Sequence, residues 1–286
     1  LYHVGGLGIV MRCVLAGATM AVPSRSAPAA ERVERFRPTH ASFVSTQLQR
    51  LLDADADLSS LHAVLLGGSA MPAALIDRAL EAGVPAVVSY GLTEMTSTVT
   101  ATRLPPSRSD LATSGAPLPH RDVRISDDGE IEVGGPTRYV GRVFEGEILP
   151  APEWHPTGDI GRFDAEGRLI VTGRRDLQFV SGGENVHPEP IEAALSALDG
   201  VLEAVVVPVP DLEFGHRPAA FVRLEDVDPT RDASTFLRTC LEDVRATLPS
   251  FMVPIVAYEW GGAEGLKPDR PALTREAERR TGERSE

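Results

Sequence analysis

The chain has 286 residues, of which 42% are hydrophobic and 24% are charged, a composition typical of a globular protein long enough for two domains. Its formal net charge of -13 argues against a general nucleic-acid binder and a membrane-surface binder, because both usually carry basic patches. The two cysteines, Cys13 and Cys240, predict neither a disulfide framework nor a zinc site, so we expect a cytoplasmic protein. Apolar runs such as residues 204–209 are too short to cross a bilayer, and no membrane insertion is expected.

The clearest pattern lies between residues 61 and 91. An apolar run at 61–66 predicts a buried strand, residues 72–80 predict a helix with Pro72 in its first turn, and residues 86–88 predict the next strand. This strand–helix–strand order is typical of a βαβ unit, so a parallel sheet is expected. Ligands bind at the carboxyl ends of strands in open α/β sheets, so the loops after these two strands are candidate binding loops.

The rest of the chain predicts a small distorted β region and then a second domain. Turn residues separate short strands in the middle of the chain, whereas helices and strands alternate again after residue 177. We therefore expect an α/β fold with domains at 1–175 and 176–286, the second a smaller α+β domain. The other expected elements are a buried helix at 9–15, strands at 19–22, 123–125, 130–133 and 168–171, a helix at 191–198, strands at 201–207 and 219–224, a helix at 233–246, a strand at 253–258 and a solvated helix at 274–286.

Two glycine-containing loops follow the strands of the βαβ unit. In Tyr90-Gly-Leu-Thr-Glu94, the tyrosine ring offers a face for stacking on a base, Thr93 a hydroxyl for a phosphate oxygen, and Glu94 a hard oxygen ligand for Mg²⁺. One loop earlier, Gly67-Gly68-Ser69 leaves room for a planar ring. Read singly, the first is equally a strand-to-helix loop and the second a site of close strand–helix packing.

Three further sequence signatures contain side chains or glycine turns that are suited to ligand binding. In Thr157-Gly-Asp159, a carboxylate beside a glycine turn can accept both hydroxyls of a ribose, and Arg174 is a cation that can reach nucleotide oxygens. The pair Gly182-Gly183 permits a sharp turn against a ligand, and Lys267 offers a point charge. Each has a structural alternative, a surface turn for the glycines and a solvated charge for Arg174 and Lys267.

Taken together, these signatures resemble the acyl-adenylating, CoA-ligase superfamily. They are Tyr90-Gly-Leu-Thr-Glu94, Thr157-Gly-Asp159, the Gly182-Gly183 segment and Gly265-Leu-Lys267-Pro-Asp-Arg270. The resemblance implies that the first domain is the remainder of a large adenylate-forming domain and that the second is its small mobile C-terminal domain. It also implies two reactions: a carboxylate and ATP form an acyl-adenylate and pyrophosphate, and the CoA thiol then displaces AMP.

The resemblance further implies a role for each signature residue, with ATP, CoA and Mg²⁺ as the cofactors. Lys267 would act catalytically together with Thr93 and Glu94, although Leu266 stands where a glycine commonly precedes that lysine. The implied contacts are Gly67, Gly68, Ser69, Tyr90 and Gly91 with adenine, Thr93 with phosphate, Glu94 with Mg²⁺, Asp159 with ribose, Arg174 with nucleotide oxygens, Lys267 with the acyl carboxylate and α-phosphate, Gly182 and Gly183 with the pantetheine arm of CoA, and Asp176 at the domain hinge.

Within the superfamily, the chain is most similar to the o-succinylbenzoate–CoA ligases of menaquinone biosynthesis. Besides the signatures above, the likeness rests on His3-Val-Gly-Gly-Leu-Gly, Met11-Arg12, His40-Ala-Ser42, Thr46-Gln47 and Glu213-Phe-Gly-His-Arg-Pro218.

An aromatic diacid needs one carboxylate activated and the other held by a cation. Arg12 lies in an otherwise apolar segment, and a buried arginine usually has an anionic partner. The hypothesis is that Arg12 binds the second carboxylate, with Ser42 donating nearby; an internal Arg–Asp pair is the alternative. His3 is assigned either to the acyl pocket or to the core.

Members of the superfamily carry a lysine-containing phosphate loop upstream of the position of Leu1, and no such loop occurs in these residues. We therefore expect the chain alone to adenylate slowly or not at all, and the open sheet edge to favour association. Two alternatives stay open, another acyl- or aryl-CoA ligase and a remnant that only binds nucleotide or a partner. Whether the chain forms a homo-oligomer is also left open.

Overall fold

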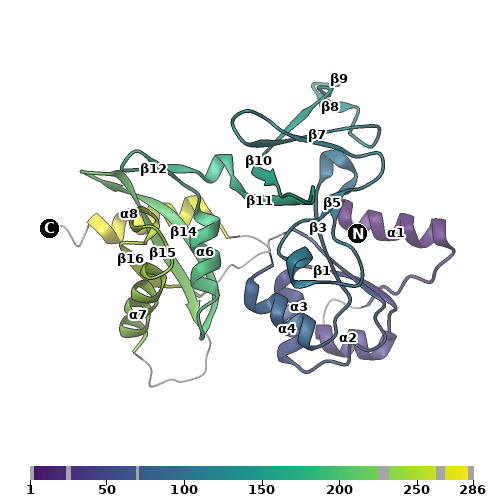
Figure 1. Cartoon of the computed structure of the whole chain (residues 1–286), viewed down its shortest axis with the longest axis horizontal. Coiled ribbons are helices and arrows are strands. Elements are labelled where there is room, and N and C mark those ends of the chain that lie inside the picture. Colours follow the sequence, from purple (N-terminus) through teal and green to yellow (C-terminus); the bar gives the residue numbers. More distant parts are fainter. Residues whose placement is uncertain (1–2, 24–26, 69–70, 225–231, 262–267, 283–286) are drawn as a thin grey trace. The chain divides into compact units, whose positions relative to one another are not determined.

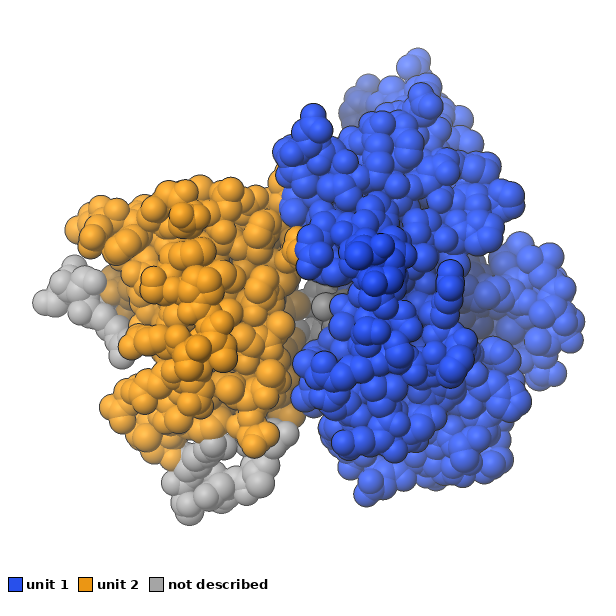
Figure 2. Space-filling view, in the orientation of Figure 1, with its two compact units in different colours: residues 1–171 blue, residues 172–286 orange. Residues whose placement is uncertain are grey.

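The computed structural model describes residues 3–23, 27–68, 71–224, 232–261 and 268–282. The chain forms two compact units, Leu1–Val171 and Thr172–Glu286, which are coloured separately in Figure 2. The domain limits at Arg175 and Asp176, and the hinge role of Asp176, stay predictions. In the part of the chain that is described, no helix has the length and apolar character needed to cross a membrane.

A five-stranded sheet forms the centre of the first unit, and the expected βαβ unit is confirmed. Strands β1, β2 and β3 are parallel, whereas β4 and β5 continue the sheet in antiparallel fashion. Pro72 is the N-cap of α4, one residue before the position expected for it. In sheet order, the strands are β1 (His40–Phe43), β2 (Ala63–Leu66), β3 (Ala86–Leu92), β4 (Ser97–Ala101) and β5 (Ala116–Pro117), and α4 (Ala73–Glu81) connects β2 to β3.

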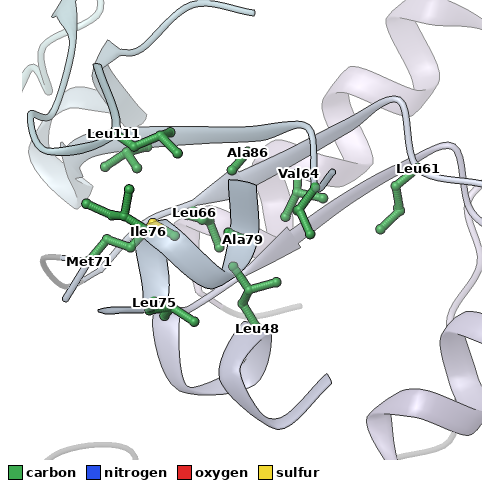
Figure 3. Packing of buried hydrophobic residues seen from close by; sticks show 12 residues of the cluster. Leu48, Leu61, Val64, Leu66, Met71, Leu75, Ile76, Ala79, Ala86 and Leu111 are labelled. Carbon is green, nitrogen blue, oxygen red and sulfur yellow. The ribbon is translucent and has the colours of Figure 1, made fainter. Parts of the chain in front are cut away.

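Helices α3 (Ser45–Asp53) and α4 cover one face of this sheet, with α5 (Arg108–Leu111) beside them (Figure 3). Alternate residues of β2, Val64 and Leu66, point into this core, as the period of two along a strand requires. Burial of these side chains at roughly 25 cal/mol per Å² is the main stabilising term for the layer that carries the binding loops. The helical side chains in the core are Leu48, Leu75, Ile76, Ala79 and Leu111.

The N-terminal segment differs from its expectation. Helix α1 (Val4–Ala16) forms, but none of its residues is buried, and Met11 and Leu15 are 58% and 82% exposed. The strand expected at 19–22 is wrong, since these residues have no regular structure. An apolar run indicates that a helix can be buried, but it does not specify what covers it. Helix α2 (Ala29–Phe36) follows.

A second sheet of the first unit corresponds to the expected distorted β region. Its order is β11 (Leu169–Arg174), β10 (His155–Phe163), β7 (Glu130–Gly134) and β6 (Asp122–Ile125). The three short strands expected here are confirmed, but β10 was missed because a register shift interrupts its pattern between Pro156 and Ile160. Beyond β7 in Figure 1 lies a separate hairpin of β8 (Gly141–Phe144) and β9 (Glu147–Pro150).

The second unit is the expected α+β domain. Its long strands β14 (Val201–Asp211) and β15 (Gly215–Leu224) are antiparallel, and β16 (Val256–Glu259) runs parallel to β15. Along β14, Ala204 and Val206 face α6 and α7, whereas Val205 and Val207 lie on the opposite face with α8. The other elements are β12 (Phe179–Ser181), β13 (Glu184–Val186), α6 (Pro188–Ser196), α7 (Ala233–Arg245) and α8 (Arg270–Gly282).

The prediction of a solvated helix at 274–286 is wrong in part, because one face of the helix is buried. Helix α8 is rich in Arg and Glu, but Ala277 is fully buried and Leu273 packs against the same cluster. Residues four positions apart share one face of a helix, so a narrow apolar stripe is enough to dock α8 on the sheet.

Candidate functional site

The loop at residues 90–94 connects two antiparallel strands through one turn of 3₁₀ helix, η1 (Thr93–Met95). The ladder between β3 and β4 shifts register between Tyr90 and Gly91. A Cβ on Gly91 would lie 1.9 Å from the carbonyl oxygen of Ser97, so the two backbones approach too closely for any other residue. The bend at the end of β3 therefore depends on this glycine.

The structure brings together two side chains that the sequence analysis assigned separately to a nucleotide. The hydroxyl of Tyr90 donates to a carboxylate oxygen of Asp159 at 2.6 Å, although the residues are 69 positions apart. In a half-buried position such a charge-assisted hydrogen bond fixes the carboxylate relative to the aromatic ring. A ring face and a carboxylate held side by side have the chemistry to receive a nucleoside, with the base on the ring and the ribose hydroxyls on the carboxylate.

The irregular part of β10 places Asp159. Gly158 has φ +77°, a conformation that glycine adopts without strain. The hydroxyl of Thr157 donates to the carbonyl of Ile131 at 2.7 Å and accepts from the backbone N–H of Asp159 at 3.1 Å. The N–H of Gly158 donates to Glu130 at 2.8 Å. Thr157 and Gly158 thus hold a bulge that directs the Asp159 carboxylate toward Tyr90.

Glu94 was expected to hold Mg²⁺, a role that stays a prediction. Its side chain is 29% exposed, and its carboxylate lies 3.5 Å from the guanidinium of Arg142. Within the described ranges, no group of three or more His, Cys, Asp or Glu residues could hold a metal by itself. Mg²⁺ is commonly bound by one or two carboxylates plus substrate phosphates, so the single carboxylate of Glu94 fits that ion. Thr93 is exposed beside it, and its phosphate contact stays a prediction.

The first glycine loop lies at the same edge of the sheet. Gly67 and Gly68 follow β2, which pairs in parallel with β3, the strand that leads to Tyr90. Gly68 has φ +87°, whereas Gly67 lies against the hydroxyl of Ser89. Neighbouring parallel strands end at one edge, so the sheet itself aligns the two loops. Ser69 lies outside the described residues.

His155 is a buried histidine of β10, the strand that carries Asp159, and no role was predicted for it. It is 8% exposed, its ring packs edge-on against Tyr139 at 5.3 Å between centroids, and the Tyr139 hydroxyl lies 3.5 Å from Nδ1. Burial lowers the pKa of His155, while Glu94 opposes and Arg142 reinforces that shift. The only signal in the sequence was its position two residues before Thr157-Gly-Asp159.

The first unit should therefore lose stability in mild acid. The folded-state pKa of His155 lies below the ordinary unfolded value of about 6.5, so its contribution is complete above that value and is lost as the pH falls toward the folded pKa. Urea titrations between pH 5 and 8 should show a smaller pH dependence for His155→Gln than for the wild type. The matched change at exposed His62 should leave the dependence as it is; equal curves for His155→Gln and wild type would contradict the assignment.

In the described part of the chain, no hydrogen bond or ion pair joins the residues assigned to the acid. Nδ1 of His3 accepts from the N–H of Gly5 at 3.3 Å and caps α1, and His3 is exposed, so the core-histidine alternative is wrong. Arg12 is exposed as well, which corrects the expectation of burial, and it has no salt bridge to a described carboxylate. Ser42 is exposed on β1. Their roles toward the acid stay predictions.

In the second unit, the two glycines form the turn of a hairpin. Strand β12 pairs with β13 from Ser181 to Glu184, and Gly182 and Gly183 have φ +60° and +89°. Such a two-residue turn favours glycine at both positions. A Cβ on Gly182 would also lie 2.8 Å from the ring of Phe214. The structural alternative thus accounts for both glycines, and their contact with CoA stays a prediction.

Arg174 and Asp176 form an ion pair at 2.9 Å, which holds the pKa of Asp176 below its ordinary value. Lys267 lies outside the described residues. Three residues further on, Arg270 anchors the start of α8, since its guanidinium lies 2.7 Å from the carboxylate of Glu192 and donates to the carbonyl of Val206 at 2.9 Å. Arg270 ends the signature that contains Lys267, but no role was predicted for it.

Comparison with known proteins shows the family of the chain. Residues 1–149 match the AMP-binding enzyme family, and residues 190–260 match the AMP-binding enzyme C-terminal domain. The chain therefore belongs to the AMP-binding enzyme family. Both the sequence resemblance and the expected fold are confirmed.

Its similar relatives carry a more particular name. The 2-succinylbenzoate–CoA ligase of Salmonella typhimurium is 42% identical over 78% of this chain and 47% of its own length. A variant of E. coli MenE solved with bound OSB-AMS has TM-score 0.82 and 36% identity over 98% of this chain and 59% of that one. The o-succinylbenzoate CoA synthetase of Bacillus subtilis in complex with ATP and magnesium ion has TM-score 0.79 and 27% identity over 96% and 59%. The chain spans about half the length of the curated relatives it matches, for example 47%.

Proposed function

We propose that this chain is part of an AMP-forming acid–CoA ligase of the cytoplasm that acts on o-succinylbenzoate in menaquinone biosynthesis. In the first step, a carboxylate oxygen of the acid attacks the α-phosphorus of ATP and pyrophosphate leaves. In the second, the thiol of CoA attacks the acyl carbonyl, loses its proton and releases AMP. Neither step needs a side-chain nucleophile, so catalysis rests on positioning and on charge stabilisation.

The observation that carries this proposal is the hydrogen bond between Tyr90 and Asp159. It unites two motifs into one surface with an aromatic face for adenine and a carboxylate for the ribose hydroxyls. The choice of o-succinylbenzoate as the acid rests on the relatives named 2-succinylbenzoate–CoA ligase and on the MenE structure solved with OSB-AMS.

The remaining roles follow from chemistry. Glu94 would hold Mg²⁺, which when bound neutralises charge on the phosphates, and Thr93 would donate to a phosphate oxygen. Lys267 would stabilise the charge that develops at the α-phosphorus. Gly182 and Gly183 would leave space for the pantetheine arm, and Arg174, freed from Asp176, would reach nucleotide oxygens.

At the acid end, Arg12 is exposed on α1 and is proposed to pair with the second carboxylate of the substrate. Arg12→Leu should weaken binding of an o-succinylbenzoyl-AMP mimic by about tenfold or more, because a charge-assisted hydrogen bond is worth about 1.5–3 kcal/mol. Binding of a benzoyl-AMP mimic, which lacks that carboxylate, should change little. Both affinities are measured by calorimetric titration.

The Arg50→Leu change at an exposed position of α3 serves as the control for loss of one positive charge. If Arg12→Leu weakens the two mimics equally, Arg12 does not read the second carboxylate. Tighter binding of a mimic made from another aryl or acyl acid would favour a different CoA ligase of the same family.

A further inference from the structure

Two arginines lie on the segment that runs beside the 90–94 loop and then enters the β8–β9 hairpin. Three contacts fix this segment against the loop. The backbone N–H of Tyr139 donates to the carbonyl of Glu94 at 2.7 Å, and the hydroxyl of Thr96 donates to the carbonyl of Thr137 at 3.1 Å. The guanidinium of Arg142 lies 3.5 Å from the Glu94 carboxylate. The first two contacts, one between backbone groups and one from the Thr96 hydroxyl, place the segment beside the loop independently of the arginine side chains.

The guanidinium N–H groups of these two arginines make few and long hydrogen bonds to described residues. The contact of Arg142 with Glu94 is long, and its side chain is 68% exposed. Arg138 is half-buried, and its Nη1 donates to the carbonyl of Tyr139 at a long 3.5 Å. Its Nε is buried without a hydrogen-bond acceptor, and it makes no salt bridge to a carboxylate in the described part of the chain.

Arg168 of the same unit differs, since its guanidinium contacts Asp164 at 2.7 Å and Asp110 at 2.8 Å. A half-buried guanidinium without a carboxylate partner is uncommon, because burial of an unpaired charge costs free energy. Arg138 and Arg142 thus place two cations beside Glu94 with only long contacts, at 3.5 Å, to acceptors among the described residues.

We propose that Arg138 and Arg142 bind the β- and γ-phosphates of the nucleotide and the pyrophosphate that leaves. Pyrophosphate is a compact polyanion, and guanidinium groups bind phosphate oxygens through paired hydrogen bonds. Glu94 by itself would repel such an anion, so cationic groups beside it are needed as well as the cation that it holds. This inference rests on the proposed function and adds a leaving-group site to it.

The surroundings of His155 agree with this placement. Arg142 and Arg138 both lower the pKa of this buried ring, whereas Glu94 and Glu130 raise it. All four charged groups thus act on one buried ring of β10, the strand that also carries Asp159.

The test is calorimetric titration of the chain with inorganic pyrophosphate in the presence of Mg²⁺. Arg142→Ala should weaken binding by about tenfold and reduce its dependence on salt, because one charged contact is lost. Arg142→Lys should restore part of the affinity, since it keeps the charge but not the paired donors. Arg138→Ala should also weaken pyrophosphate binding. Because the Arg142 side chain is exposed, its replacement should not disturb folding.

Arg124→Ala is the matched control. Arg124 belongs to the same β region, stacks 4.2 Å above the ring of Trp154 and pairs with Glu132, so its loss should leave pyrophosphate affinity within about twofold. Unchanged affinity in Arg142→Ala, or no binding of pyrophosphate by the folded wild type, would overturn the inference.

A second ligand separates this site from the proposed function. An acyl-AMP mimic carries no β- or γ-phosphate, so Arg142→Ala should bind it as the wild type does. If the mimic binds but the affinity for pyrophosphate is unchanged in Arg142→Ala, the proposed function stands and this inference fails. If pyrophosphate binding depends on Arg142 while no mimic binds, the anion site stands and the proposed function fails. Equal weakening of both ligands would count against a leaving-group site.

Discussion

Replacing Gly91 with alanine is expected to lower the free energy of unfolding of the first unit by about 3 kcal/mol or more. The added Cβ would lie 1.9 Å from the carbonyl oxygen of Ser97, 2.6 Å from its carbonyl carbon and 2.9 Å from Cα of Thr98. All three are backbone atoms of β4, so no side-chain rotation relieves the clash. Strand β4 must move away from β3, which breaks the ladder that shapes the 90–94 loop.

Gly67→Ala is the matched control because it places the same methyl group at the edge of the same sheet. Its close neighbour, 3.2 Å away, is the hydroxyl of Ser89, which can rotate, so the expected cost is below about 1 kcal/mol. Urea unfolding in a Trp260→Phe background leaves Trp154 to report on the first unit. Similar midpoints for the two alanine variants would refute the argument from backbone approach.

Asp159→Ala is expected to weaken binding of an o-succinylbenzoyl-AMP mimic by about 100-fold. A carboxylate that accepts both ribose hydroxyls makes two charge-assisted hydrogen bonds, each worth about 1.5–3 kcal/mol. Tyr90→Phe keeps the ring for stacking but removes the donor that orients the carboxylate at 2.6 Å. Its loss of affinity should be smaller, about three- to tenfold. Calorimetric titration measures both.

Asp127→Ala removes an exposed carboxylate from a turn of the same β region and should bind the mimic as the wild type does. Circular dichroism of each variant checks that the unit stays folded. Wild-type affinity in Asp159→Ala would mean that this carboxylate does not contact the ribose and that the nucleotide binds elsewhere.

Much of the fold was predictable because the signals are local. The run at 61–66, the helix that follows Pro72 and the strand at 86–88 form β2, α4 and β3 as expected. Patterns of period two and 3.6 are properties of neighbouring residues, and a βαβ unit buries its apolar faces almost within itself.

The failures are cases in which a distant contact decides the outcome. Strand β10 was missed because its bulge at Gly158 is held by Ile131 and Glu130 from β7. The sequence of α8 predicts a solvated helix, but in the folded protein Leu273 and Ala277 pack against the sheet. For α1, the apolar pattern predicted burial, yet none of its residues is buried in this structure.

By itself, the sequence determined the order of the elements, the candidate nucleotide residues and the membership in a family, because motif spacing and hydrophobic period are carried by the chain alone. The tertiary structure decided which of those residues meet. Only the folded sheets bring Tyr90 to Asp159 and set Arg138 and Arg142 beside Glu94. The physical reason is that hydrogen bonds and charges act over a few ångströms, whereas these partners are 44 to 69 residues apart in the chain.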